Sequence, residues 1–75
     1  MDIDKELDTC GLKRPYPILR TRMLVNQLVC GQVLKVVATD PGSMEDMEWF
    51  CRQTGHKLMQ ASLDSDTYTF VIRKV

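Results

Sequence analysis

The chain has 75 residues, which is the size of one small domain, and we expect residues 1–75 to form a single unit. Ten basic residues balance ten acidic ones, whereas nucleic-acid-binding domains are usually visibly basic, so direct nucleic-acid binding is not expected. No apolar run approaches the roughly 18 residues that a membrane-spanning helix needs, so no membrane association is expected. The acidic first six residues lack an apolar core, which predicts an intracellular protein without a signal peptide.

The first half of the chain predicts a strand, a helix and a second strand. Leu7–Cys10 is a short strand candidate that ends at Gly11. Pro15–Leu28 is expected to be helical, because its apolar residues recur at helical spacing and Gly31 follows shortly after its end. Val33–Thr39 is rich in β-branched residues and predicts a strand whose alternate side chains face the helices.

A second helix is expected after a turn that contains proline and glycine. Two starts remain open: Asp40 as N-cap with Pro41 at the first helical position, or Ser43 as N-cap with Asp46 three residues later. An apolar stripe at spacings of three and four continues to about Thr54, where the helix should end.

The last third of the chain predicts a β-hairpin. Gly55 is a natural stop for the second helix. His56–Leu63 and Thr67–Lys74 are expected to be strands on either side of the turn Asp64–Asp66. The predicted order is therefore β-α-β-α-β-β. It indicates an α/β two-layer sandwich, in which two helices cover one face of a mixed four-stranded sheet. The first two strands should be parallel and the last two antiparallel.

The turn before the first helix has an unusual composition. Residues 11–17 read Gly-Leu-Lys-Arg-Pro-Tyr-Pro, which places Arg14 at or beside the N-cap if Pro15 takes the first helical position. The start of a helix favours negative charge, and a cysteine there would be a reactive thiolate. This chain has a permanent cation instead.

Several segments carry a family resemblance, namely Leu7–Leu19, Gly31–Val36, Thr39–Ser43, Phe50–His56 and Ile72–Lys74. Together they are similar to the TusA-like (SirA-like) sulfur-carrier proteins, whose signature is a glycine-leucine pair, one variable residue and then Cys-Pro-x-Pro. The resemblance extends from about Leu7 to Lys74. It departs from the signature at one position, because Arg14 stands where the family has the cysteine that carries the persulfide.

The resemblance implies a cytoplasmic carrier that takes sulfane sulfur from a cysteine desulfurase or rhodanese-type donor and passes it to a downstream relay protein. The family serves tRNA thiolation, molybdenum-cofactor maturation and sulfur oxidation. With Arg14 in place we expect a sulfurtransferase-type carrier that is impaired in transfer. The alternative is a non-catalytic binding or regulatory module on the same scaffold. A third hypothesis is nucleic-acid binding, because the predicted architecture resembles the C-terminal domain of a bacterial translation initiation factor. The neutral charge counts against it.

Candidate site residues follow from the turn and from the resemblance. Arg14 marks the persulfide position, and Cys10 is the candidate substitute thiol, although both are also compatible with plain turn and strand-end roles. Gly11, Pro15, Pro17 and Asp40 are expected to shape the site. Together with Arg14, the residues Lys13, Arg20 and Arg22 form a basic patch. It is either a solvated face or a docking surface for an acidic protein partner or for RNA phosphates.

The remaining cysteines predict neither a disulfide framework nor a metal site. The gaps between Cys10, Cys30 and Cys51 are 20 and 21 residues, which match no zinc-finger spacing. We expect all three thiols to be reduced, Cys51 to lie in the core and Cys30 to be incidental. The sequence predicts no metal and no cofactor, and it leaves the oligomeric state open.

Overall fold

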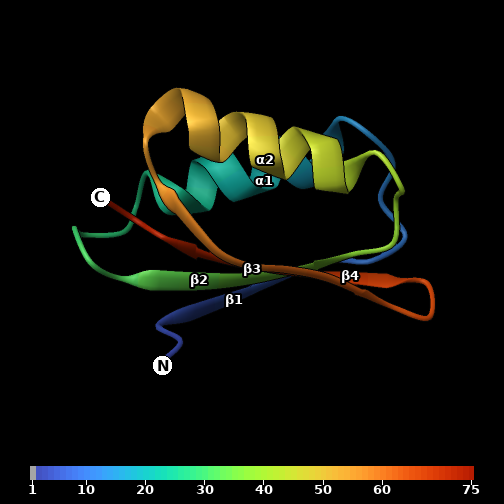
Figure 1. The fold of residues 1–75 in the computed structure, drawn as a ribbon, viewed down its shortest axis with the longest axis horizontal. Helices are drawn as coiled ribbons and strands as arrows, with labels where there is room; N and C mark the ends of the chain where they lie inside the picture. The colour runs from blue at the N-terminus through green and yellow to red at the C-terminus, as the bar shows by residue number, and fades with distance from the viewer. Residues whose placement is uncertain (1) are drawn as a thin grey trace.

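Six regular elements follow one another in the predicted order. The structure is a computed structural model that describes residues 2–75. Its elements are β1 (Lys5–Thr9), α1 (Tyr16–Val25), β2 (Val33–Ala38), α2 (Ser43–Thr54), β3 (Lys57–Asp64) and β4 (Thr67–Arg73). Both helices lie on the same side of the sheet, so the two-layer sandwich is confirmed (Figure 1). Within residues 2–75, no helix is both long enough and apolar enough to cross a membrane.

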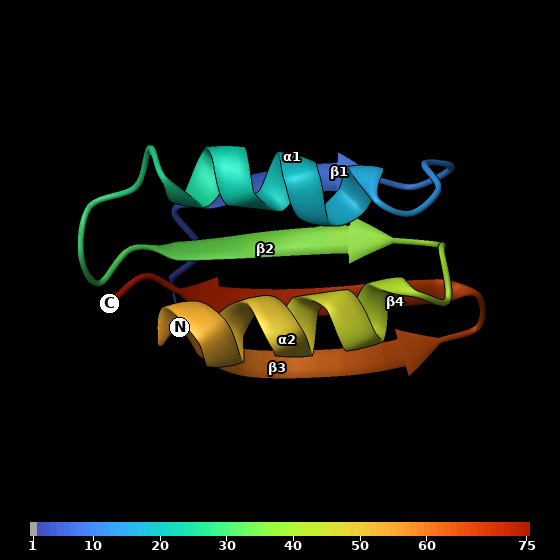
Figure 2. The ribbon, with the colours of Figure 1, turned by 90° about the horizontal axis from the view of Figure 1, so that it is seen from above.

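The sheet is mixed, with strand order β1-β2-β4-β3. β1 pairs with β2 in parallel, and β4 runs antiparallel to both of its neighbours. Seen from above, α1 lies over the β1–β2 side of the sheet and α2 over the β4–β3 side (Figure 2). Because β1 and β2 are parallel neighbours, the loops that follow them leave the sheet at the same end.

Alternate side chains of β2 and β4 are apolar and buried, and they define the face of the sheet that carries the core. Leu34, Val36 and Ala38 are fully buried, and they pair across the sheet with Ile72, Phe70 and Tyr68. This face packs against buried residues of the helices, which include Val25, Met47 and Phe50. The sequence prediction that alternate residues of the second strand face the helices is therefore confirmed.

β1 begins two residues earlier than predicted and leaves Cys10 outside the strand. Lys5 pairs with Leu34, so the polar start of β1 belongs to the sheet. Asp4 extends this contact, because its N–H donates to the Val33 carbonyl (2.9 Å) and its carboxylate accepts the Val33 N–H (2.8 Å). An edge strand with one open face tolerates such polar residues, which apolar patterning alone misses.

α1 is shorter than the predicted Pro15–Leu28. Pro15 is the N-cap and Tyr16 the first helical residue, so the placement of Pro15 inside the helix was wrong by one position. At the other end the N–H of Leu28 donates to the carbonyl of Val25, three residues back, so the backbone tightens into a turn. Leu28 is still buried, and its carbonyl accepts the Lys74 ammonium at 2.7 Å.

Neither of the two side-chain caps considered for α2 forms among the described residues. Gly42 is the N-cap, and Ser43 is the first helical residue, buried rather than capping. The backbone carbonyl of Asp40, not its side chain, accepts the Ser43 N–H at 3.0 Å. The stop at Gly55 is confirmed, since its φ of +81° is left-handed and its N–H donates to the Cys51 carbonyl.

The other strand ends differ from prediction by one residue. β2 ends before Thr39, β3 is Lys57–Asp64 rather than His56–Leu63, and β4 ends before Lys74. The left-handed glycine that ends α2 turns the chain, and pairing with β4 begins only at Lys57. The hairpin closes through Ser65, whose φ is +57°, and a bulge interrupts the pairing between Leu58 and Gln60.

His56 joins the end of α2 to the end of the described chain. Its Nδ1 accepts the N–H of Val75 at 3.2 Å, and its ring lies 5.8 Å from the ring of Phe50. Partial burial, and then the positive charge of Lys74, lower the pKa of His56. His56 therefore contributes to the fold as a neutral ring that accepts a hydrogen bond.

We predict that the free energy of unfolding falls as the pH is lowered from about 6.5 toward 5, because the unfolded chain takes up the His56 proton first. Urea unfolding across this range measures the effect. In His56→Asn, which retains an acceptor but does not titrate, the slope in this window should disappear. An unchanged slope would contradict the role given to His56.

The different burial of two large residues of α2 predicts that their removal lowers the free energy of unfolding by very different amounts. Met47 is fully buried and Trp49 is 53% exposed. Met47→Ala should lower the free energy of unfolding by about 2–5 kcal/mol, because it leaves a cavity under the helix. Trp49→Ala should cost less than about 1 kcal/mol. Urea midpoints of the two variants check this, and equal losses would show that α2 is packed differently.

Candidate functional site

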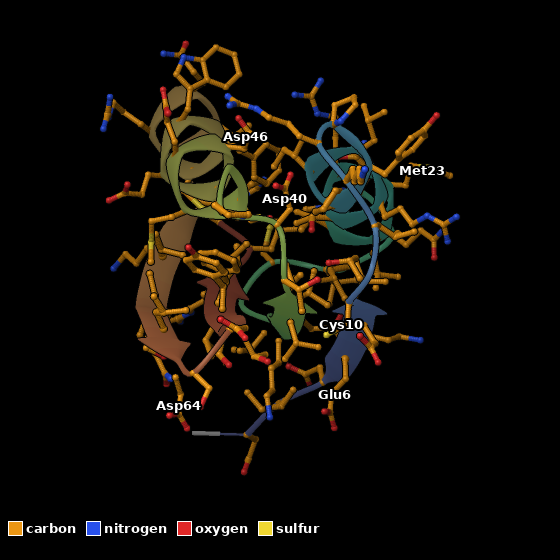
Figure 3. All side chains as sticks on the ribbon, turned by 90° about the vertical axis from the view of Figure 1, so that its right-hand side faces the viewer. Glu6, Cys10, Met23, Asp40, Asp46 and Asp64 are labelled. Carbon is orange, nitrogen blue, oxygen red and sulfur yellow. The ribbon has the colours of Figure 1, made fainter. Side chains whose placement is uncertain are left out.

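The site is built where the loops after β1 and β2 meet at the carboxyl ends of two parallel strands, a common place for sites in α/β folds. Figure 3 looks at this end of the molecule, with Asp40 and Asp46 near the helices and Cys10 at the level of the sheet. The Gly11 N–H donates to Thr39 Oγ1 at 2.9 Å. The Arg14 N–H donates to Asp40 Oδ2 at 2.6 Å. These two bonds fix the loop before α1 against the loop before α2.

The Arg14 side chain crosses from one helix start to the other. It lies directly before the N-cap of α1, and its Nη2 donates to Asp46 Oδ1 in the first turn of α2 at 2.7 Å. The Arg14 side chain is 52% exposed, whereas that of Asp46 is only 18% exposed. Arg14 is thus beside the helix start, as the sequence predicts, and a carboxylate from the neighbouring helix compensates for a cation that the α1 dipole disfavours.

Gly42 makes room for this arginine. A Cβ atom built on Gly42 would lie 2.9 Å from Arg14 Cδ, which is closer than such atoms approach in real proteins. The aliphatic stem of Arg14 therefore passes directly over the backbone at the N-cap of α2. The contact shows that the side chain follows a defined path between the two loops.

Cys10 lies beside the carboxylate of Asp8. It is exposed in the turn after β1, and its N–H donates to Asp8 Oδ1 at 2.9 Å. The hydrogen bond between its thiol and Asp8, followed by slight burial and the charge of Asp8, raises the pKa of Cys10. In turn, the N–H of Cys10 lowers the pKa of Asp8. Less of this thiol is ionised at neutral pH than in an ordinary cysteine.

The other two thiols are either buried or on a different loop. Cys51 is buried in α2, and burial raises its pKa to about 11. Cys30 is exposed in the loop after α1, which lies at the opposite end of the sheet from the α1 start (Figure 2). Across residues 2–75, no group of three or more His, Cys, Asp or Glu side chains is arranged to hold a metal ion.

The residues of the predicted basic patch have different surroundings in the structure. Arg14 is paired with Asp46, and the Arg22 guanidinium lies 5.7 Å from the ring centre of Phe50 in α2. Lys13 is exposed in the loop, and it borders a hollow of about 240 Å³ that is also lined by Gly11, Leu12, Thr39, Asp40 and Pro41. Arg20 borders a separate groove of about 370 Å³, which is also lined by Leu7, Met23, Leu24 and Gln27.

An apolar strip on α1 was missed by the sequence analysis. Tyr16, Leu19 and Met23 are 56%, 44% and 67% exposed, although all three are large and apolar. Their spacing of three and four residues places them on one side of the helix. The same spacing was visible in the sequence, where it is read more naturally as a core stripe. Met23 lies on the outer side of α1 in Figure 3.

Asp46 and Gly42 are the site residues that sequence reasoning did not identify as such. Asp46 was considered only as part of a helix cap. The parallel pairing of the first two strands was predicted, and it already implied that the loops after them would meet. The sequence did not predict that the Arg14 side chain crosses this junction and binds Asp46.

Fold and site together define a small two-layer α/β domain whose distinctive position lies at the start of its first helix. The sulfurtransferase TusA family model matches residues 5–74. The chain is 47% identical over 73 residues to the sulfur carrier protein TusA of Allochromatium vinosum, covering 97% of this chain and 96% of that protein. The chain belongs to the TusA family.

Further similarities agree with this assignment. A putative sulfur carrier protein of Neisseria meningitidis is 49% identical over 67 residues, which cover 89% of this chain and 90% of that protein. The crystal structure of a SirA-like protein from Desulfitobacterium hafniense superposes with a TM-score of 0.82 at 18% identity, covering 92% of this chain and 95% of that one. At that identity the structural likeness shows the fold alone.

The hydrogen bonding around Cys10 gives a direct test of its reactivity. Asp8→Asn should lower the Cys10 pKa and speed its alkylation at neutral pH, because the carboxylate that stabilises the protonated thiol is removed. The rate of iodoacetamide labelling, resolved by peptide mass spectrometry, measures this. Cys30 in the same sample is the internal control. If the labelling of Cys10 slows, or accelerates only as much as that of Cys30, then Asp8 does not raise the pKa of Cys10.

Proposed function

We propose that this protein is a sulfur-relay protein that docks with relay partners but does not itself carry a persulfide at residue 14. Membership of the TusA family and the relatives named as sulfur carriers support the relay role. The observation that supports the absence of a persulfide is the identity of residue 14, which is an arginine. It occupies the motif position at the start of α1 and is held by Asp46.

Persulfide transfer needs a thiolate at that position. In the forward step the thiolate attacks the outer sulfur of the donor's persulfide, a new sulfur–sulfur bond forms, and the donor cysteine leaves as a thiolate. The Arg14 guanidinium offers no lone pair for such an attack and only donates hydrogen bonds. No adjustment of neighbouring residues gives this side chain the missing chemistry.

No other thiol of the chain is placed to take over. Asp8 raises the pKa of Cys10, which lowers its thiolate fraction, and Cys51 is buried. Cys30 belongs to the loop after α1, and this loop lies at the far end of the sheet from the two loops that form the site (Figure 2). Arg14 is therefore proposed to mark the position of the lost persulfide cysteine, and Cys10 is not proposed as its substitute.

The proposed partners are proteins: a cysteine desulfurase or rhodanese-type donor and a downstream relay acceptor, acting in the cytoplasm. Residues 13–39 contain basic residues but no acidic ones; the basic residues are Lys13, Arg14, Arg20, Arg22 and Lys35. This charge favours partners with an acidic docking face, and Lys13, Arg20 and Arg22 are proposed to contact it. Each branch implied by the family, tRNA thiolation among them, would use the same docking step.

A second candidate function is a binding or regulatory module outside sulfur relay. The exposed strip of Tyr16, Leu19 and Met23 favours it, because large apolar side chains on a helix surface are typical of protein interfaces. The two candidates differ in whether the chain recognises a sulfur donor. They share the expectation that Arg14 carries no sulfur.

The proposal is tested by incubating the protein with a cysteine desulfurase and cysteine, and measuring intact mass. The unchanged chain should gain no sulfur atom, whereas Arg14→Cys should gain one on the introduced thiol, because the α1 start lowers the pKa of a thiol there. Alkylation before proteolysis locates the sulfur on a peptide.

Two controls make this result specific. Arg14→Ser removes the guanidinium without supplying a thiol and should remain unloaded. Cys10→Ser in the Arg14→Cys background should load as well as Arg14→Cys alone. Efficient loading of the unchanged chain that is abolished by Cys10→Ser would identify Cys10 as the carrier and overturn the proposal.

A further inference from the structure

The ion pair between Arg14 and Asp46 links the loop before α1 to α2. Asp46 belongs to α2, 32 positions along the chain from Arg14, so the pair joins two separate elements. We infer that Asp46 is a positioning residue that reserves residue 14 for a cation: it holds the Arg14 guanidinium, and it would oppose a thiolate placed at the same position. The inference deepens the proposed function by naming a second residue that determines what the site can do.

The path of the side chain supports this assignment. The Arg14 N–H is anchored on Asp40 at 2.6 Å, its Cδ passes over Gly42, and its Nη2 reaches Asp46 at 2.7 Å. Backbone, stem and head group each have a defined contact. The stem and the head group of Arg14 thus each lie against the loop before α2 or its first turn, while the side chain stays half exposed.

The shielding of Asp46 makes its charge relevant to any other side chain at residue 14. With a side chain only 18% exposed, Asp46 is less screened by water than an ordinary surface carboxylate. If Arg14 is replaced by a neutral side chain, this carboxylate loses the cation that now pairs with it. A thiolate formed there would then meet a negative charge that the helix start must outweigh.

Three further charged residues belong to the same segments: Lys13 on the loop of residue 14, Asp40 before α2, and Glu45 beside Asp46 in the first turn of α2. Asp40 is bonded to the backbone of residue 14, so it stays in place whatever side chain residue 14 carries. Glu45 is exposed and one residue from Asp46, which makes it the matched control for removing one negative charge from the same turn.

The test measures the pKa of a thiol introduced by Arg14→Cys. Cys10→Ser and Cys30→Ser are added so that the introduced thiol is the reactive one, since Cys51 is buried. The pH dependence of iodoacetamide alkylation is then compared in three chains, with no further change, with Asp46→Asn, and with Glu45→Gln. Circular dichroism and thermal melting establish that each is folded, and Asp46→Ser replaces Asp46→Asn if the latter is not.

Asp46→Asn should lower the pKa of the introduced thiol, because it removes the negative charge that faces the side chain of residue 14. Glu45→Gln should shift it by clearly less, and added salt should shrink the Asp46 effect. Equal shifts in the two variants, or no shift with Asp46→Asn, would overturn the inference.

The outcome is separable from that of the proposed function. If the thiol pKa depends on Asp46 while a desulfurase still fails to load Arg14→Cys, the relay role fails and the assignment of Asp46 stands. If the Arg14→Cys chain loads sulfur but its thiol pKa is indifferent to Asp46, the relay role stands and the assignment of Asp46 fails.

Discussion

The hydrogen bond from the Arg14 N–H to the Asp40 carboxylate is the contact on which the site depends. It uses the backbone of residue 14, so it fixes where that residue lies without specifying its side chain. Parallel pairing of β1 with β2 brings the two loops to the same end of the sheet, and this bond then joins them. The fold therefore offers a fixed position at the start of α1, and the side chain there decides the chemistry.

In this chain the side chain is a cation with a structural partner. A thiol at a helix start gains reactivity from the helix dipole, whereas an arginine there is disfavoured by it. The first turn of α2 supplies Asp46, and Gly42 leaves space for the arginine stem. Surface ion pairs contribute little to stability, typically about 1 kcal/mol or less, so the pair matters more for where the guanidinium lies than for holding the fold together.

Much of the fold was predictable from the sequence because its signals are local and mutually consistent. The β-branched alternation of β2, the apolar stripe of α2 and the stop at Gly55 each depend on a few neighbouring residues. The errors fall where tertiary contacts decide. Pairing with β2 starts β1 at the polar Lys5, and a tightened turn ends α1 at Val25. Within the site, the place of Arg14 followed from its motif, but its partner Asp46 is remote in sequence, and the raised pKa of Cys10 depends on Asp8.

The central claim is that the chain docks as a relay protein without accepting sulfur, and competition tests it most directly. A desulfurase that loads the Arg14→Cys chain is assayed for sulfur transfer to that chain in the presence of excess unchanged protein. Docking without loading predicts that the unchanged protein slows the transfer in a concentration-dependent way and remains free of sulfur. Transfer at an unaltered rate, with the unchanged chain in large excess, would contradict the account.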